Sequence, residues 1–500
     1  MFKLKIFITI SLFSLIFILA SCSTPTETPK GDLTGTVNLQ GLSDHSGITI
    51  TLYDLAYLDT TIVRINNQYP QIGVHIYQHT EFDHRLQSPV KSVETLSDGS
   101  FELSKIPTGT YNLVAMKADF GFKYMCEIEI NEGDNELSQQ IDLFEELNIS
   151  GNISDDIVVA PDHHLIIDDD TVFIPGSSLT IHPGAIIRIN PGADLTIHGN
   201  LLAQGEENNM FWITSNDGFE NSQRTTHNLT LSNREIGLYN SMELSSIATV
   251  ENDLITWGKW DYANTCLLNQ VNNLHVQNGI FRNGRCGLYS VAVDSTFCGN
   301  LLAQNCFGES EGGIKYLNIN DGEISNSIFC NSFNGIITKL EFKGIIKLNY
   351  FYNNNNGIEI WDNNGIIEHN YLERNSHCDV HFTLNHNIIT DTLKIMYNSF
   401  YSGYNILHFH DPSFNEYSEI LFDKNNFYAT DYFLYTHGTY NSNNAGKEIK
   451  VISSFFKDCF SIQEIEEKVW DCEDGIEYYM LDVHIINFQF DPIDINLRRN

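Results

Sequence analysis

A short asparagine motif recurs through the second half of the chain, and its spacing constrains the fold more than any other feature. The motif is Asn-x-[Ile/Leu/Phe], and one series of seven copies is separated by 22, 26, 23, 21, 28 and 27 residues. The copies begin at Asn278, Asn300, Asn326, Asn349, Asn370, Asn398 and Asn425. A period of about two dozen residues is typical of repeat architectures in which each unit packs against its neighbours.

A second pattern lies upstream and gives the same period. Pro-Gly pairs at 175–176, 183–184 and 191–192 recur every eight residues, and apolar and polar positions alternate between them. Strands of about five residues that turn every eight would close a three-sided coil in ~24 residues. Only Pro412 interrupts residues 192–491, as continuous hydrogen-bonded ladders require.

Together the two patterns predict an all-β chain whose main body is a right-handed parallel β-helix over 155–490. Asparagines should occupy the tight corners, where they tolerate unusual backbone angles, and stack along the axis with amide-to-amide hydrogen bonds. Residues 217–262 lack clear repeats and predict an irregular coil, and residues 461–500 predict a C-terminal cap. The pattern resembles the pectin-lyase-like superfamily, and most closely its exported asparagine-rich β-helix repeat proteins, which have no assigned activity.

Residues 31–148 alternate apolar and polar positions in short runs with turn signals between them, which predicts a small β-sandwich. Its most informative stretch runs from Asp98-Gly99-Ser-Phe101 to Ile106-Pro-Thr-Gly-Thr-Tyr111. This DGSF…IPTGTY arrangement resembles the carboxypeptidase regulatory-like family, which implies a spacer or docking module without catalytic residues. Residues 54–89 fit the pattern less well and suggest an insertion.

The first residues carry the marks of a secretory signal. Lys3 and Lys5 precede an apolar run from Ile6 to Ala20, which is shorter than the ~20 residues of a membrane-spanning helix. The run ends at Leu19-Ala20-Ser21-Cys22, which resembles the lipobox of bacterial lipoproteins. The resemblance implies a signal peptide over 1–21, lipid on Cys22, a disordered leash over 22–30, and attachment in the cell envelope, at the outer membrane of a Gram-negative bacterium. An ordinary signal peptide followed by an unmodified cysteine is the alternative.

Charge and cysteine content exclude several functions. The 28 basic and 64 acidic residues give a net charge of −36, which argues against nucleic acid as a partner. Polyanionic glycans would need a bridging divalent cation, so calcium is compatible with the sequence but no cofactor is firmly implied. The metal candidates are Asp168, Asp169 and Asp170, for which an exposed turn is the alternative. The ten cysteines contain no CxxC pair, which favours buried free thiols over a disulfide framework or a zinc site.

One stripe of residues is the candidate site on the predicted β-helix. If the apolar residues after each corner point inward, their neighbours form an outward row on consecutive coils. The catalytic candidates in this row are Glu359, His381, His408 and His410, and the glycan-binding candidates are Trp361 and Tyr289. Carboxylate and imidazole groups about 4.8 Å apart can bind a metal or transfer protons, and an aromatic face can stack on a sugar. A solvated polar ladder is the alternative.

The sequence therefore leaves two functions open. The first is a non-catalytic, membrane-tethered β-helix that presents an extended surface for glycan binding or adhesion, with a polysaccharide or cell-surface glycan as partner. The second is a polysaccharide lyase or glycoside hydrolase with a divergent site on the outer face. No arginine and aspartate pattern of the known lyases or hydrolases is present, so the sequence favours the first.

Overall fold

The structure is a computed structural model that describes residues 28–216 and 238–494. Short gaps in this description fall at 309–310, 364, 384–392, 402–404, 411–419, 429–431, 438–446, 460, 462, 465–468, 472–480, 488 and 490. The predicted signal peptide, Cys22 and most of the leash lie outside the described residues. Within the described part, no helix has both the length and the apolar character needed to span a membrane.

The chain divides into two compact units. The first comprises residues up to Leu55, together with Ser88–Met116 and Tyr124–Asp142. It is a β-sandwich-like pair of sheets with the strand orders β4-β1-β7, where β8 also pairs with β1, and β3-β2-β5-β6. The strands are β1 (Lys30–Leu39), β2 (Thr49–Tyr53), β3 (Lys91–Glu94), β4 (Ser100–Pro107), β5 (Gly109–Lys117), β6 (Gly121–Ile130), β7 (Gly133–Glu136) and β8 (Ile141–Leu143). The predicted Asp98-Gly99 turn joins β3 and β4, with Gly99 at φ +80°.

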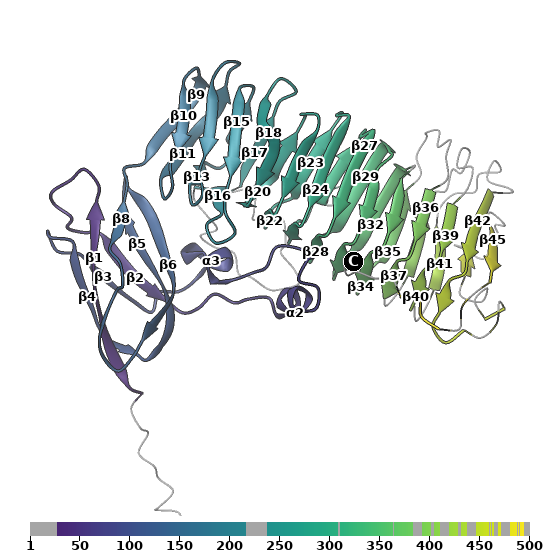
Figure 1. Ribbon diagram of the computed structural model, residues 1–500, viewed down its shortest axis with the longest axis horizontal. Helices are drawn as coiled ribbons and strands as arrows, with labels where there is room; N and C mark the ends of the chain where they lie inside the picture. Colours follow the sequence, from purple (N-terminus) through teal and green to yellow (C-terminus); the bar gives the residue numbers. More distant parts are fainter. Residues whose placement is uncertain are drawn as a thin grey trace, which may run out of the picture. The chain divides into compact units, whose positions relative to one another are not determined.

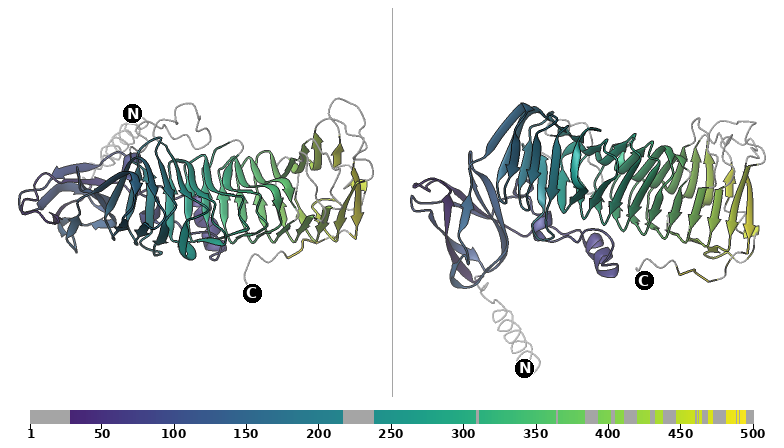
Figure 2. Two further views of the ribbon diagram at one scale, coloured as in Figure 1. Left: turned by 90° about the horizontal axis from the view of Figure 1, so that it is seen from above. Right: turned by 45° about the horizontal axis from the view of Figure 1, so that its top comes forward.

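The second unit comprises Ala56–Gln87, Lys117–Lys123 and Leu143–Asn500, and its main body is a parallel β-helix with three faces. It confirms the predicted fold class. In Figure 1 its strands are stacked in chain order from β9 to β45, and both views in Figure 2 show the same order from blue to yellow. The chain enters through β9 (Leu147–Ile153) and β11 (His164–Phe173), which pair with each other. The helix therefore begins at Leu147, earlier than the predicted residue 155.

Face I is a sheet of 13 parallel strands. They are β10 (Asp156–Val159), β12 (Ser178–Ile181), β15 (Asn200–Gln204), β18 (Thr249–Thr256), β21 (Leu274–Gln277), β24 (Ser295–Gly299), β27 (Asp321–Ser325), β30 (Ile345–Lys347), β33 (Ile366–Glu368), β36 (Leu393–Met396), β39 (Ile420–Asp423), β42 (Lys447–Ile452) and β45 (Leu481–Ile486).

Face II continues from β11 with short strands. They are β13 (Ile186–Ile189), β16 (Phe211–Ser215), β19 (Gly258–Asp261), β22 (Ile280–Arg282), β25 (Leu302–Gln304), β28 (Ile328–Cys330), β31 (Tyr350–Tyr352), β34 (Tyr371–Glu373), β37 (Ser399–Tyr401), β40 (Asn426–Phe427) and β43 (Phe455–Phe456).

Face III also continues from β11, with mostly longer strands. They are β14 (Asp194–Ile197), β17 (Tyr239–Leu244), β20 (Ala263–Asn269), β23 (Cys286–Val291), β26 (Gly312–Leu317), β29 (Asn334–Phe342), β32 (Asn356–Asn363), β35 (Cys378–Thr383), β38 (Asn405–His410), β41 (Tyr432–His437) and β44 (Val469–Asp471).

The structure describes parts of both segments that the sequence set apart from the regular repeats, 217–262 and 461–500. Residues 217–237 lie outside the described part, while Tyr239–Asp261 forms β17, β18 and β19, which pair with the preceding coil. The pairing of β18 with β15 and that of β17 with β20 each contain a register shift. The predicted cap over 461–500 also contains β44 and β45, which continue faces III and I. Both segments lie outside the series of seven asparagines, and pairing with the preceding coil is sufficient to continue each ladder.

The asparagine motif occurs in two phases that differ by one residue. Asn278, Asn300 and Asn326 lie at corners with φ between +50° and +55°, as predicted. From Asn349 onward the corner residue is instead the one before the motif asparagine, as in Leu348 at φ +57°. The prediction of an asparagine at every corner is therefore wrong for the later copies.

The later motif asparagines form a buried ladder inside the cylinder. Asn349, Asn370 and Asn398 each donate from Nδ2 to Oδ1 of the next asparagine in the series, over 3.0–3.1 Å. The series ends at Asn425, and all four side chains are buried. The predicted amide-to-amide stacking is confirmed for these four residues. The buried backbone N–H groups of the same asparagines are satisfied by the same Oδ1 atoms, so each amide serves two donors.

Residues 56–87, inserted between β2 and β3, form a strap over face II. The strap contains α2 (Thr60–Gln68), α3 (Gln78–Glu81) and the 3-10 turn η1 (His84–Leu86), and Figure 1 shows α2 next to β28. Its apolar side chains pack on an outward row of the coils, which comprises Ile280, Leu302, Ile328 and Tyr350. Gly73 has φ +71° and donates its N–H to the carbonyl of Asn326, and a Cβ there would lie 2.5 Å from Ile328. Only glycine permits this approach.

Candidate functional site

The predicted outward stripe exists on face III. The backbone register aligns Tyr289, Lys315, Ile337, Glu359, His381, His408 and Tyr435 on seven consecutive strands from β23 to β41. The residues that precede them in each strand were predicted to point inward, and Leu288, Ile314, Ile336, Ile358, Val380 and Leu407 are all in the core. His410 lies at the end of β38, in register with Thr383 rather than with the stripe, and its side chain lies outside the described residues.

Trp361 and Glu359 form a linked pair in the middle of the stripe. The indole Nε1 of Trp361 donates to Oε1 of Glu359, and the ammonium of Lys339 lies 3.6 Å from the centre of the Trp361 ring. Tyr289 is paired in the same way with Lys315, whose Nζ lies 4.5 Å from the ring centre. Both rings are partly exposed. One face of each ring is therefore covered by a cation from a neighbouring strand.

Burial shifts the pKa of both charged groups that contact Trp361. Glu359 is only 6% exposed, and burial raises the pKa of its carboxyl, although the Trp361 hydrogen bond and Lys339 act in the opposite direction. Burial likewise lowers the pKa of Lys339, and Glu359 opposes that shift. Burial therefore disfavours the charged form of both groups, and their mutual attraction partly offsets that effect.

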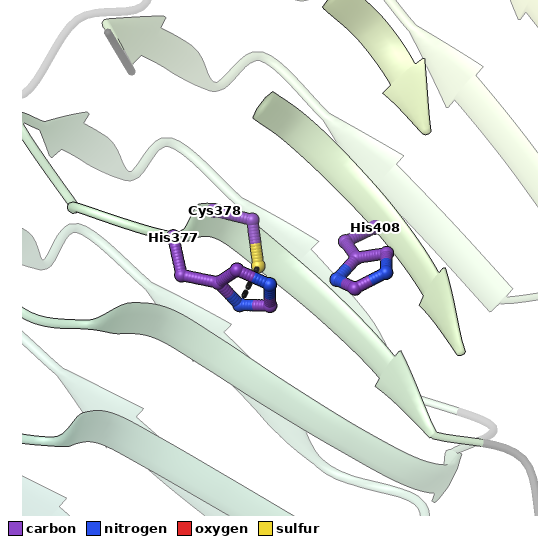
Figure 3. Close-up of side chains that lie close together, drawn as sticks. All are labelled: His377, Cys378 and His408. Atoms are coloured by element: carbon purple, nitrogen blue, oxygen red, sulfur yellow. Dashed lines mark hydrogen bonds between the residues drawn. The ribbon is translucent and has the colours of Figure 1, made fainter. Parts of the chain in front are cut away.

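Histidines gather at the next two coils. The rings of His381 and His408 stack at 4.9 Å, and the ring of His377 lies edge-on to both, at 5.4 Å and 4.6 Å. His377 immediately precedes β35, and Cys378 is the first residue of that strand. In Figure 3 the side chains of His377, Cys378 and His408 converge on one space, with His377 and Cys378 from one coil and His408 from the next.

His377 and Cys378 were not among the residues that the sequence singled out. The register places Asn334, Asn356, Cys378 and Asn405 at one position on successive strands of face III. The signal was therefore a cysteine that has an asparagine at the same position on the strand before it and on the strand after it, with a histidine immediately before the cysteine. The series of seven asparagines lies beside face II and did not reveal this position on face III.

The metal candidates Asp168, Asp169 and Asp170 lie next to one another in β11. They are exposed at a register shift within β11, where Oδ1 of Asp170 accepts the backbone N–H of Asp194 and Oδ1 of Asp169 accepts that of Asp170. Their oxygens serve the backbone at the bulge. The group that could hold a metal, among the residues described, is His377, Cys378 and His408.

No protein-family model, curated protein or solved structure matches this chain. Any function therefore has to be argued from the residues themselves.

A second group of polar residues lies beneath the strap. Arg282 on β22 pairs with Glu81 of the strap at 2.8 Å and lies 3.7 Å from Asp261. Burial disfavours the charge of Asp83, but Arg85 at 2.9 Å holds the pKa of that carboxyl well below its usual range. Because these charges are paired and covered by the strap, they attach the strap to the coils and leave no polar surface for a ligand.

Beyond the strap, face II carries a tyrosine ladder. Tyr350, Tyr371, Tyr401 and Tyr428 stack in order on consecutive coils, with ring centres 4.7, 4.9 and 3.9 Å apart. The rings cover one another's faces, so the ladder presents edges and hydroxyl groups. A sugar therefore finds a more accessible ring face at Trp361 and Tyr289 than in this ladder.

Proposed function

We propose that this chain is an exported, membrane-tethered β-helix protein that binds a glycan on the outer surface of face III. The observation that carries the proposal is the Trp361–Glu359 pair, in which a partly exposed indole is held in place by a buried carboxylate. A fixed aromatic ring beside charged hydrogen-bonding groups is a common way to bind a sugar, since the ring contacts C–H groups and the charged groups orient hydroxyls.

The surrounding stripe supports a ligand longer than a single sugar. Tyr289, Lys315, Lys339 and Trp361 lie on four successive strands, which at about 4.8 Å per strand extend over ~14 Å. Lysines at this position favour a sugar that carries hydroxyl or carboxylate groups, despite the net charge of −36 over the whole chain. The repeated coils thus supply a linear row of contacts for a linear polymer.

The attachment and family assignments belong to the same proposal. The Leu19-Ala-Ser-Cys22 sequence supports lipid on Cys22 and a place in the outer membrane of a Gram-negative bacterium, with the sandwich as a carboxypeptidase regulatory-like spacer. The asparagine-rich coils support a place in the pectin-lyase-like superfamily. Labelling of cells with an alkyne-bearing fatty acid should mark the full chain, and Cys22→Ala should remove the label and release the protein from the membrane fraction.

Glycan binding is tested with the full chain in detergent on an array of plant, algal and bacterial polysaccharides. We expect binding of one or a few glycans, with at least a tenfold loss of affinity in Trp361→Ala and a smaller loss in Tyr289→Ala. Tyr57→Ala is a matched control, since Tyr57 is 75% exposed on the strap. Equal binding by wild type and Trp361→Ala would exclude the stripe as the binding surface.

A second candidate function is polysaccharide cleavage. The observation that favours it is the register of Glu359, His381 and His408 on three adjacent strands, which brings a carboxyl and two imidazoles within reach of one sugar linkage. An assay for reducing ends or unsaturated products on the same polysaccharides decides between the two. Cleavage that is lost in the triple variant Glu359→Gln, His381→Gln, His408→Gln would replace binding by catalysis as the function.

A further inference from the structure

Three metal-binding side chains meet at one place on face III, beside the proposed glycan surface. One ligand atom from each of His377, Cys378 and His408 lies within 4.8 Å of the other two. The Sγ of Cys378 and Nδ1 of His377 are already 3.7 Å apart. In a tetrahedral zinc site, with Zn–S of about 2.3 Å and Zn–N of about 2.0 Å, a sulfur and a nitrogen ligand are ~3.5 Å apart. Two of the three ligands therefore have close to the separation that the ion requires, and the ligand atom of His408 lies within 4.8 Å of both.

We propose that His377, Cys378 and His408 bind Zn²⁺ or a transition-metal ion of similar softness. One thiolate and two imidazoles suit zinc and copper, whereas calcium and magnesium prefer oxygen ligands. The site therefore differs in chemistry from the calcium that the acidic residues of the sequence suggested. It also differs in place from Asp168–Asp170, which lie on β11.

The neighbouring coil holds two of these ligands in position. Oδ1 of Asn356 accepts hydrogen bonds from Sγ of Cys378 at 3.2 Å and from Nδ1 of His377 at 2.8 Å. Asn356 is fixed in turn, because its Nδ2 donates to Oδ1 of Asn334 at 2.8 Å. In the metal-free protein these hydrogen bonds hold the thiol and the imidazole close together, and coordination of an ion through Sγ and Nδ1 would replace them.

Burial and access are both suitable for a bound ion. Cys378 is 0% and His408 6% exposed, so the ion would be shielded from most competing solvent ligands. His377 is partly exposed and provides a route of entry. Three protein ligands leave a fourth position for a small molecule, next to the ring of His381.

The test uses Co²⁺ as a spectroscopic probe of the full chain, after chelation and reduction. We expect one equivalent of Co²⁺ to produce the intense near-ultraviolet absorption of a cobalt–thiolate bond, and Zn²⁺ to abolish it by displacement. Cys378→Ser should lose this absorption, and His408→Gln should weaken Co²⁺ binding at least tenfold. Cys306→Ser and His369→Gln are the controls, since each changes the same residue type outside the cluster and should retain binding.

Zn²⁺ should also raise the melting temperature of the wild type and of both controls, with no shift in Cys378→Ser or His408→Gln. This second measurement reads out variants that bind the ion without the thiolate signal. Absence of the cobalt–thiolate absorption in the folded wild type would overturn the proposal. Undiminished Co²⁺ binding in folded His408→Gln would do the same. Neither result depends on glycan binding, so the metal site and the proposed function can fail separately.

Discussion

Face II contains two stretches that bury the outside of the coils differently. In β22, β25 and β28 the first residue of each strand is aliphatic and points outward beneath the strap. In β34 and β37 the same position holds Tyr371 and Ser399, and Arg64 reaches Glu373 as an ion pair at the edge of the strap. The first stretch thus needs an apolar cover, whereas the second presents polar groups.

The difference follows from a one-residue slip in the repeat. In the first stretch the apolar residue of Asn-x-[Ile/Leu/Phe] points outward, as in Ile328, whereas in the second it points inward, as in Phe351. A one-residue shift reverses every side chain of a strand. The strap covers the coils where the motif places its aliphatic residue outside, and the buried asparagine ladder occurs where the motif has shifted inward.

The largest expected effect is at the ion pairs beneath the strap. Arg282→Leu removes the partner of Glu81 and leaves Asp261, which is fully buried, without its nearest cation. We expect a loss of about 3–5 kcal/mol in the free energy of unfolding, measured by denaturant titration. The control is Arg64→Ala, which breaks the exposed pair with Glu373 and should cost less than about 1 kcal/mol. Similar losses in the two variants would show that the strap is held by its apolar contacts alone.

The second stretch is tested by removing one residue of its buried asparagine ladder. Asn398→Ala removes the acceptor of Asn370 and the donor to Asn425, so several buried polar groups lose their partners. We expect a loss of about 3 kcal/mol in stability, since each unsatisfied buried group costs about 1–3 kcal/mol. The exposed Asn152→Ala should change stability by less than about 0.5 kcal/mol. A loss below 1 kcal/mol in Asn398→Ala would mean that the ladder adds little to the coils.

Two buried histidines near the strap, His84 and His164, should also make stability depend on pH. Burial lowers the pKa of His84 to about 4 and that of His164 to about 3, from an ordinary value near 6.5. The unfolded chain therefore binds protons more readily, and stability is complete above pH 6.5 and falls as the pH drops toward 4. Each imidazole contributes at most about 1.4 kcal/mol per pH unit. Melting temperatures measured between pH 7 and pH 4.5 should fall less with decreasing pH in the double variant His84→Gln, His164→Gln than in the wild type.

The smallest effect tests the apolar contact of the strap. Ile65 of α2 is 0% exposed against the outward row, and Ile65→Val should reduce stability by about 1 kcal/mol. Ile247→Val is the matched control, because Ile247 is 59% exposed and its change should be close to zero. Equal stability of the two variants would show that α2 is loosely packed on the coils.

The sequence predicted the architecture well because a repeat fixes period and face together. The core residues of face III, from Leu288 to Leu407, followed from the spacing alone, as did the register of Glu359, His381 and His408. The slip between Asn326 and Asn349 could not be predicted, since both phases satisfy the same motif. The His377–Cys378 pair was also missed, because its significance depends on which column of the cylinder each residue enters.

The strap also has a consequence for the order of folding. Its residue Thr80 bonds to Arg282, 202 residues later, and Arg64 pairs with Glu373, 309 residues later. Contacts so distant in the chain form slowly, and during synthesis the strap emerges long before its partners. Until the coils near residue 350 are complete, the aliphatic face of α2 remains exposed to other chains. We therefore expect strap substitutions such as Ile65→Val to speed unfolding with little effect on the folding rate, and the nascent chain to depend on chaperones until that point.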